Sequence, residues 1–309
     1  MSRLHFQLFG KFTAEKDGQT LTGLDAGKDQ ELLSYLLIHR DRHHSREALA
    51  ALLWGDSSTE KSKKYLRQSL WHLQTVLESN EQDRFYPLLV EHDWLKLNPR
   101  SEVGSDVAEF ERAFADAQGI AGAQLDSRRA DLLKSAIEAY RGDLLTGWYQ
   151  DWILFERERL QNIYLMMLDK LICYSDHRHE HEAAQVFAAT VLRYEPARER
   201  THRQLMSSYY LAGDRTAALR QYDRCVAALR EELGVRPERR TMQLYEQIKS
   251  DEFQPSNSGE NRITATNKPL SNDVVGRLRH LQTILSAVQR RIQRDIRAVE
   301  SLSRTDDKL

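Results

Sequence analysis

Residues 45–77 read SREALAALLWGDSSTEKSKKYLRQSLWHLQTVL, and this stretch decides the fold of the first third of the chain. Its apolar residues recur every three or four positions, which is the period of a helix that buries one side. The pattern predicts one helix over residues 45–55 and another over residues 58–77. Of the two, the second is the richer in lysine and arginine.

Four leucines mark the buried side of the second helix, at spacings of four, three and four residues: Leu66, Leu70, Leu73 and Leu77. We expect the polar residues to point outward at Lys61, Lys64, Gln68, His72 and Thr75, with Lys63, Arg67 and Gln74 on the flanks. Trp71 lies outside the stripe as well. Because a tryptophan beside a core stripe packs more often than it contacts a base, we expect it to pack.

The segments around these helices complete a recognisable layout. Residues 4–9 and 12–14 alternate like a pair of strands, and residues 30–39 have the helical period. Residues 88–97 form two alternating strands about a turn at His92 and Asp93. Three short helices, the last one basic, followed by a hairpin are typical of a winged helix-turn-helix.

A winged helix-turn-helix places its last helix in the major groove, so this frame assigns a role to the cations. The predicted DNA-binding residues are Lys61, Lys63, Lys64, Arg67, Gln68 and His72 of the helix, with His92 and Lys96 of the hairpin. Lysines near the first turn suit phosphates, and Arg67, Gln68 and His72 suit base edges. Glu91 and Asp93 repel phosphate and make the wing a weak DNA element. The competing interpretation is an ordinary solvated helix face, and the winged-helix frame weighs against it.

Composition limits the class of protein. The chain has 309 residues, enough for two domains, with 40% hydrophobic and 29% charged residues. A net charge of −1 excludes a bulk polyelectrolyte binder, so any DNA contact depends on local placement. There is no apolar run near the roughly 20 residues of a membrane helix, and we expect no signal peptide and no membrane partner. The two cysteines, Cys173 and Cys225, lie in helical patterns, which suits buried thiols in a cytoplasmic, nucleoid-associated protein.

From residue 106 onward the pattern is almost entirely helical, with internal repetition. HEAA at 181–184 and RTAA at 215–218 lie 34 residues apart, and each begins a helix after a turn. Helix pairs with this period are tetratricopeptide-like and bury their apolar faces against their neighbours. The expected fold class is mainly α with a small β component: a winged helix-turn-helix followed by a tetratricopeptide-like helical repeat domain.

The sequence resembles the Streptomyces antibiotic regulatory protein (SARP) family in both parts. The N-terminal resemblance rests on GKDQELL (27–33), LLIH (36–39), SREAL (45–49) and LLWG (52–55). The second part resembles the bacterial transcriptional activation domain of that family through GDLL (142–145), Trp152 with ERERL (156–160), YEP (194–196), ALRQY (218–222) and EELGVRP (231–237). The resemblance covers about residues 4–248.

The resemblance implies a DNA-binding activator that recruits RNA polymerase, often through its sigma factor, to promoters with direct repeats. Three departures bear on this. The second helix carries Leu73-Gln74-Thr75 where many members are basic, the wing reads EHDW (91–94) rather than being glycine-rich, and the chain continues past residue 248. The first two affect the strength and sequence preference of DNA binding more than the fold.

The C-terminal part is expected to contain a linker and a helix. QPSNSGEN at 254–261 is linker-like, and the expected domains are 1–104, 105–252, a linker at 253–271 and an amphipathic helix at 272–305. Nearly four heptads run through Val274, Leu278, Leu281, Leu285, Val288, Ile292, Val299 and Leu302, interrupted at Asp295. We favour a coiled coil that makes a homodimer. The alternatives are docking on the same chain and, third, a basic helix on DNA or a membrane surface.

Other clusters suggest no chemistry. Residues 176–181 (DHRHEH) contain metal-ligand types without a known spacing and are expected to be a solvated turn, and 156–159 (ERER) an ion-paired surface face. The sequence contains no phosphate loop, nucleophile elbow or HExxH, so we expect no enzyme and no cofactor. The rival to a transcription activator is a tetratricopeptide-like adaptor without sequence-specific DNA binding.

Overall fold

The computed structural model describes residues 3–77 and 87–253. Its first sheet brings together strands from residues 4–20 and from residues 103–105. β1 (Leu4–Gln7) pairs antiparallel with β2 (Thr13–Lys16), and β2 pairs antiparallel with β3 (Gln19–Thr20). On its other side β1 pairs in parallel with β7 (Val103–Ser105), so the strand order is β3-β2-β1-β7. The predicted strand pair is confirmed, and the return of the chain to β1 at β7 was not predicted.

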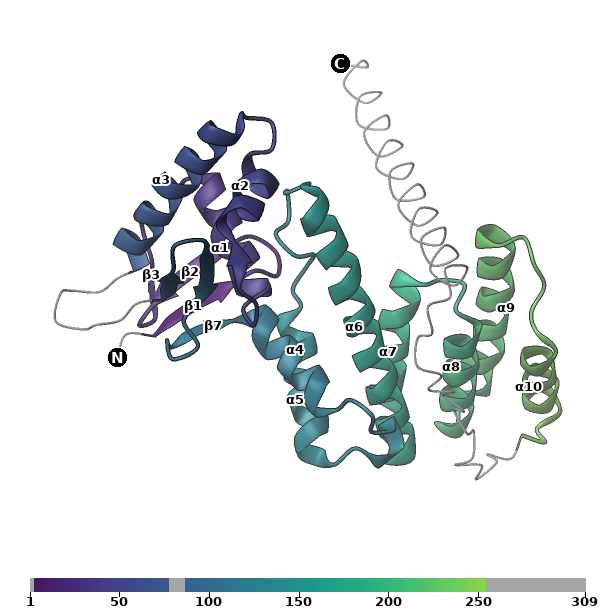
Figure 1. Ribbon diagram of the computed structural model, residues 1–309. Coiled ribbons are helices and arrows are strands. Elements are labelled where there is room, and N and C mark those ends of the chain that lie inside the picture. Colours follow the sequence, from purple (N-terminus) through teal and green to yellow (C-terminus); the bar gives the residue numbers. More distant parts are fainter. Residues whose placement is uncertain (1–2, 78–86, 254–309) are drawn as a thin grey trace, which may run out of the picture. The chain divides into compact units, whose positions relative to one another are not determined.

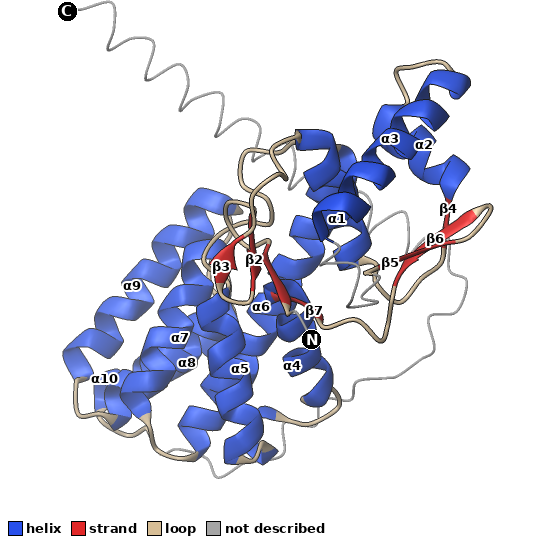
Figure 2. Ribbon diagram, turned by 90° about the vertical axis from the view of Figure 1, so that its left-hand side faces the viewer, coloured by secondary structure: helices blue, strands red, loops and turns tan. Residues whose placement is uncertain are grey.

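The winged helix-turn-helix is confirmed. The three helices are α1 (Gly27–Ile38), α2 (Arg46–Trp54) and α3 (Thr59–Leu77). The hairpin of β5 (Leu88–Val90) and β6 (Trp94–Leu97) is joined by the short β4 (His44–Ser45) in a second sheet of order β4-β6-β5, which Figure 2 shows apart from the first. Ser45 also caps α2, since its Oγ accepts a hydrogen bond from the amide of Ala48 at 3.4 Å.

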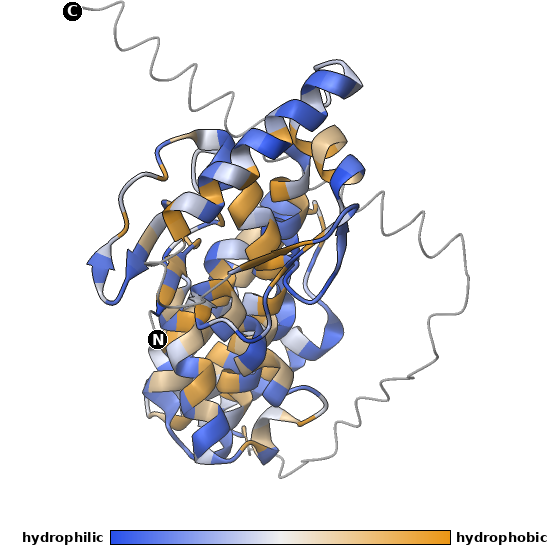
Figure 3. Ribbon diagram, turned by 60° about the vertical axis from the view of Figure 1, so that its left-hand side comes forward, coloured by the Kyte–Doolittle hydropathy of each residue, from blue (hydrophilic) through white to orange (hydrophobic). Residues whose placement is uncertain are grey.

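The leucine stripe of α3 forms part of the core. The four leucines at 66, 70, 73 and 77 are at most 3% exposed, and hydrophobic and hydrophilic residues follow one another along this helix in Figure 3. The expectation for Trp71 was wrong, because its side chain is 67% exposed. Val76 packs against the core beside these leucines, whereas Trp71 lies on the outward side of the helix.

Helices make up the rest of the described chain and pack in chain order (Figure 1). They are α4 (Asp106–Asp116), the 3-10 turn η1 (Gly122–Gln124), α5 (Ser127–Ala139), α6 (Asp151–His177), α7 (His181–Tyr194), α8 (Glu199–Leu211), α9 (Arg215–Glu232) and α10 (Arg239–Ser250). The two repeated strings begin α7 and α9, and their alanines Ala184 and Ala218 are 1% and 0% exposed. The predicted helix starts are therefore confirmed.

The winged helix and the helical region form one compact unit that ends at Phe253. β7 leads directly into α4, so the expected boundary at residues 104 and 105 falls inside continuous structure. The predicted linker and C-terminal helix lie, apart from residue 253, outside the described residues.

Aromatic rings form the core of this joint. Phe9 lies 5.1 Å from Phe110 and 4.7 Å from Tyr140 between ring centroids, and Tyr140 stacks on Tyr164 at 4.4 Å. Phe9 also forms a β-bridge with Leu144 of the GDLL string. These contacts connect the first strand, α4 and α6 in one hydrophobic core.

The expectation that residues 156–159 form a solvated face was wrong for Arg157. Its side chain is buried and donates to the carbonyl oxygens of Leu144, at 2.6 Å, and Leu145. Arg159 and Glu156 do form the expected ion pair at 2.6 Å. Leu145 has a positive φ of 48°, and its carbonyl oxygen also accepts a hydrogen bond from the amide of Trp148 at 3.1 Å. The guanidinium thus adds donors to the backbone carbonyls of this turn.

Candidate nucleic-acid interface

The buried leucine stripe fixes the orientation of α3, and a polar contact with a neighbouring helix lies on each flank of it. His72 Nδ1 lies 2.6 Å from Asp29 Oδ2 of α1, and Lys63 Nζ lies 2.8 Å from Glu47 Oε1 of α2. The leucine stripe lies between these two contacts. The helix therefore presents one side to solvent in a defined rotation.

That outward side carries most of the predicted DNA-binding residues. Lys61, Lys64, Arg67 and Gln68 are exposed, as is Thr75 further along. His72 does not point outward as expected but lies half-buried against α1, and Gln74 is half-buried too. The structure thus brings four of the six predicted helix residues together on a free face and engages Lys63 and His72 with neighbouring helices.

The wing is held against the start of α2. The amide of Arg46 donates to the carbonyl oxygen of Asp93 at 2.9 Å, and its guanidinium donates to that of His92 at 3.3 Å. The His92 side chain is 98% exposed, and Lys96 Nζ lies 2.8 Å from His43 Nε2. Both predicted wing residues are therefore at the surface.

Sequence reasoning missed three residues of this region: His43, Arg46 and Trp94. They come together because β4 pairs with β6, with Ser45 opposite Trp94. A strand of two residues gives no periodic signal in the sequence.

A chain of contacts connects α1 with α6. Glu31 is 2% exposed and accepts from Trp152 Nε1 at 3.2 Å and from Lys28 Nζ at 2.8 Å. Tyr35 packs edge-on against Trp152 with ring centroids 5.2 Å apart. Nearby, burial lowers the pKa of His39, while the carboxylate of Glu156 acts in the opposite direction. The helix that supports α3 through Asp29 is thus the same helix that contacts the helical region.

A buried carboxylate anchors the joint. Asp106 accepts hydrogen bonds from the amides of Leu8 and Phe9, each at 2.9 Å, and from Val107 at 2.8 Å. Burial raises the pKa of Asp106, and the three amide donors oppose that rise.

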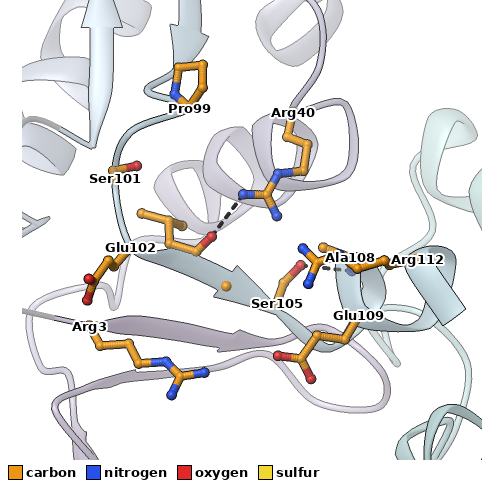
Figure 4. Close-up of a pocket in the computed structure, with 11 residues that line it drawn as sticks. Arg3, Arg40, Pro99, Ser101, Glu102, Ser105, Ala108, Glu109 and Arg112 are labelled. Atoms are coloured by element: carbon orange, nitrogen blue, oxygen red, sulfur yellow. Dashed lines mark hydrogen bonds between the residues drawn. The ribbon is translucent and has the colours of Figure 1, made fainter. Parts of the chain in front are cut away.

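A pocket of about 490 Å³ lies where β7 meets α4 (Figure 4). Arg3, Arg40 and Arg112 line it together with Glu102 and Glu109, and Arg40 donates to the carbonyl oxygen of Val103 at 2.9 Å. The two carboxylates offset two of the three guanidinium charges. The pocket therefore offers only a weak preference for an anion.

The DHRHEH turn contains no metal centre. In residues 3–77 and 87–253, no group of three or more His, Cys, Asp or Glu side chains is placed to hold a metal ion. Arg178 pairs with Glu180 at 3.1 Å, and residues 177–180 are exposed, as a solvated turn requires. Asp176 is half-buried, which raises the pKa of its carboxyl to about 6.

The two cysteines, Cys173 and Cys225, differ in burial. Cys225 is fully buried, and burial raises the pKa of its thiol to about 12, whereas Cys173 is half-buried. None of the described helices is both long enough and apolar enough to cross a membrane.

Comparison with known proteins places the helical region in a family. Residues 105–249 match the model of the bacterial transcriptional activator domain. The chain is 26% identical over 296 residues to the regulatory protein AfsR of Streptomyces coelicolor, covering 92% of this chain and 29% of that protein. It is 24% identical over 248 residues to the transcriptional regulatory protein MoaR1 of Mycobacterium bovis, covering 79% of each.

A solved structure supports the fold. EmbR of Mycobacterium tuberculosis, determined in complex with a low-affinity phosphopeptide, superposes with a TM-score of 0.61 at 20% identity. The match covers 82% of this chain and 67% of EmbR. The order of a winged helix and a helical region is thus common to both proteins.

Proposed function

Because the chain belongs to the SARP family of bacterial regulators, we propose that it binds duplex DNA through α3 and activates transcription. One observation carries the proposal: the outward side of α3 presents Lys61, Lys64, Arg67 and Gln68 while its opposite side is locked into the core. A helix held in this way can enter the major groove without reorganising.

The exposed residues divide by chemistry. Lys61 and Lys64, near the first turns of α3, would meet phosphates, and each such contact makes binding weaker at high salt. Arg67 and Gln68 have the forked donors and acceptors that pair with guanine and adenine edges. His92 and Lys96 of the wing would add backbone contacts. The carboxylates of Glu91 and Asp93 limit that contribution, and the β4–β6 pairing also places His43 and Arg46 beside the wing.

We propose RNA polymerase holoenzyme, through its sigma factor, as the partner of the helical region α4–α10. This rests on the family and on the match to the activator domain at residues 105–249. The chain spans only 29% of the length of AfsR, so this assignment concerns the shared portion alone. The proposed role is regulatory rather than enzymatic, needs no cofactor, and would be exercised in the cytoplasm at the nucleoid.

The test is duplex binding by the full chain, measured by fluorescence anisotropy on sequences selected from a random duplex library. Lys64→Ala and Arg67→Ala should weaken binding with an unchanged melting temperature, because both side chains are exposed. Loss of a phosphate contact should lower the salt slope by about 1, and loss of a base contact should cost roughly 1–3 kcal/mol at one position.

Arg220→Ala, an exposed arginine of α9, is the matched control and should bind like the wild type. If both α3 variants bind like the wild type, α3 does not contact the DNA. If no duplex binds in a salt-dependent, sequence-specific way, the chain is an adaptor whose helix pairs bind proteins.

A further inference from the structure

We propose that Trp71 gives the protein its preference for a thymine in its target, through contact of the indole with the thymine methyl group in the major groove. The inference rests on the proposed DNA binding and deepens it. It assigns a specificity role to a side chain that the leucine stripe leaves outside the core.

The first observation is the position of Trp71. It is 67% exposed, against 39% for Tyr65, the other exposed large apolar side chain of α3. It lies seven residues after Lys64 and three after Gln68, so all three share the outward side of the helix. An indole that follows the polar residues on this outward side is solvated in the free protein and buried only when a partner covers it.

The second observation is that α3 cannot rotate to bury this ring. His72, the next residue, lies 2.6 Å from Asp29, and Leu70 and Leu73 on either side are at most 3% exposed. Turning Trp71 inward would require breaking the contact with Asp29 and exposing a leucine. The indole is therefore held outward by its neighbours.

The third observation concerns the polarity of the surrounding surface. The Thr75 hydroxyl, one turn later, donates to the carbonyl oxygen of Trp71 at 2.9 Å. Its hydrogen is thus already used within the helix and is not free for a base. The C-terminal half of the outward side is therefore less polar than the half that carries Lys61, Lys64, Arg67 and Gln68.

Groove geometry and chemistry identify the ligand. At about 1.5 Å rise per residue, Trp71 lies about 10 Å along the axis from Lys64, within the roughly 12 Å width of the major groove. Guanine, adenine and cytosine present only donors and acceptors there, whereas thymine presents a methyl group. That methyl group is the part of the groove floor that an apolar ring fits best.

The experiment uses the full chain and replaces thymine by uracil, one position at a time, in the duplexes selected from the random library. Uracil removes only the methyl group and keeps base pairing. Wild-type protein should lose about fourfold in affinity at one position, the value for one buried methyl group. Trp71→Ala should bind thymine and uracil duplexes equally at that position.

Phe155→Ala is the matched control, because Phe155 is also a large exposed aromatic side chain, at 63%, but lies on α6. It should keep the full response to uracil. The inference is overturned if Trp71→Ala responds to uracil as the wild type does, or if no position responds in the wild type. If the library yields no selected sequence at all, the proposed function fails first, and the inference falls with it.

Discussion

Two buried charged side chains, Asp106 and Arg157, form hydrogen bonds with backbone amide and carbonyl groups far from them in the sequence. Asp106 accepts hydrogen bonds from the amides of Leu8 and Phe9, and Arg157 donates to the carbonyls of Leu144 and Leu145. Both bind backbone groups in segments that lie outside the named helices and strands and are linked only by a single β-bridge between Phe9 and Leu144. A buried charge of this kind is tolerated because its hydrogen bonds replace those of water.

Among single residues, Leu70 tests the face assignment of α3. Leu70→Ala should lower the free energy of unfolding of the full chain by about 2–5 kcal/mol, because the side chain is 3% exposed and its loss leaves a cavity. Denaturant unfolding measures the change, and Lys64→Ala on the opposite side is the control. A loss under about half a kcal/mol would contradict the core assignment.

The pKa of Asp176 predicts a dependence of stability on pH. Burial raises this pKa to about 6, while the unfolded chain has the ordinary value of about 3.9. The folded protein therefore holds the proton more tightly, and the stability from this group is present at low pH and lost as the pH rises through about 6.

Asp176→Asn replaces the titrating carboxyl by a neutral amide and so removes the loss of stability at high pH. It should raise the free energy of unfolding near pH 8 by about 1 kcal/mol, after allowance for solvent at this half-buried site, and should have little effect near pH 4. Denaturant unfolding across this range measures it, with the exposed Asp56→Asn as control. An equal shift at both pH values would argue against titration of Asp176.

At the scale of elements, α7 and α9 show how the repeat is built. Each begins after a turn, at His181 and Arg215, and each places a buried alanine at its fourth residue. A small side chain there lets the neighbouring helices approach closely. The repeat therefore depends on small side chains at these two positions as well as on the apolar residues of the helix faces.

Ala218→Leu should therefore overpack the contact of α9 with its neighbours and cost roughly 1–3 kcal/mol. The measurement is thermal unfolding of the full chain, and Ala227→Leu, at an exposed position of the same helix, is the control and should cost little. Unchanged stability of the Ala218 variant would mean that the two repeats are misaligned.

At the scale of the molecule, the winged helix and the helical region share one core. The first strand pairs with β7, Phe9 packs on Phe110 and Tyr140, and the buried Glu31 accepts from Trp152. A shift of α6 would therefore act on α1 through the contact of Trp152 with Glu31, and on α3 through the contact of Asp29 with His72.

A fragment of residues 1–104 should consequently be much less stable than residues 1–253. It lacks Asp106, and each buried amide left without an acceptor costs about 1–3 kcal/mol. Phe9 would also lose both ring partners. Near-ultraviolet circular dichroism during thermal melting compares the two fragments. A cooperative transition at the same temperature in both would show that the module is independent.

The C-terminal heptads predict an oligomer. The full chain should sediment as a dimer at micromolar concentration, residues 1–253 should be monomeric, and only the full chain should bind a two-repeat duplex with added avidity. If the full chain and residues 1–253 are both monomeric and bind the two-repeat duplex with equal affinity, the 272–305 segment docks on its own chain instead.

The sequence by itself determined the elements and their apolar faces. The leucine stripe of α3, the wing hairpin and the 34-residue repeat could be predicted because helical and strand periods are local properties of the chain. The SARP resemblance extended this to the order of the two parts. For an outward side, such periods predict which residue types it carries but not which partners those residues contact.

Tertiary structure alone decided which polar or edge residues acquire partners. The parallel pairing of β1 with β7 spans about a hundred residues and has no turn signal, and it brings Asp106 to Leu8. His72 was expected outward but meets Asp29, whereas Trp71 was expected to pack but is exposed. The physical reason is that periodicity gives the direction of a side chain from its own helix, whereas the neighbouring element decides what it meets.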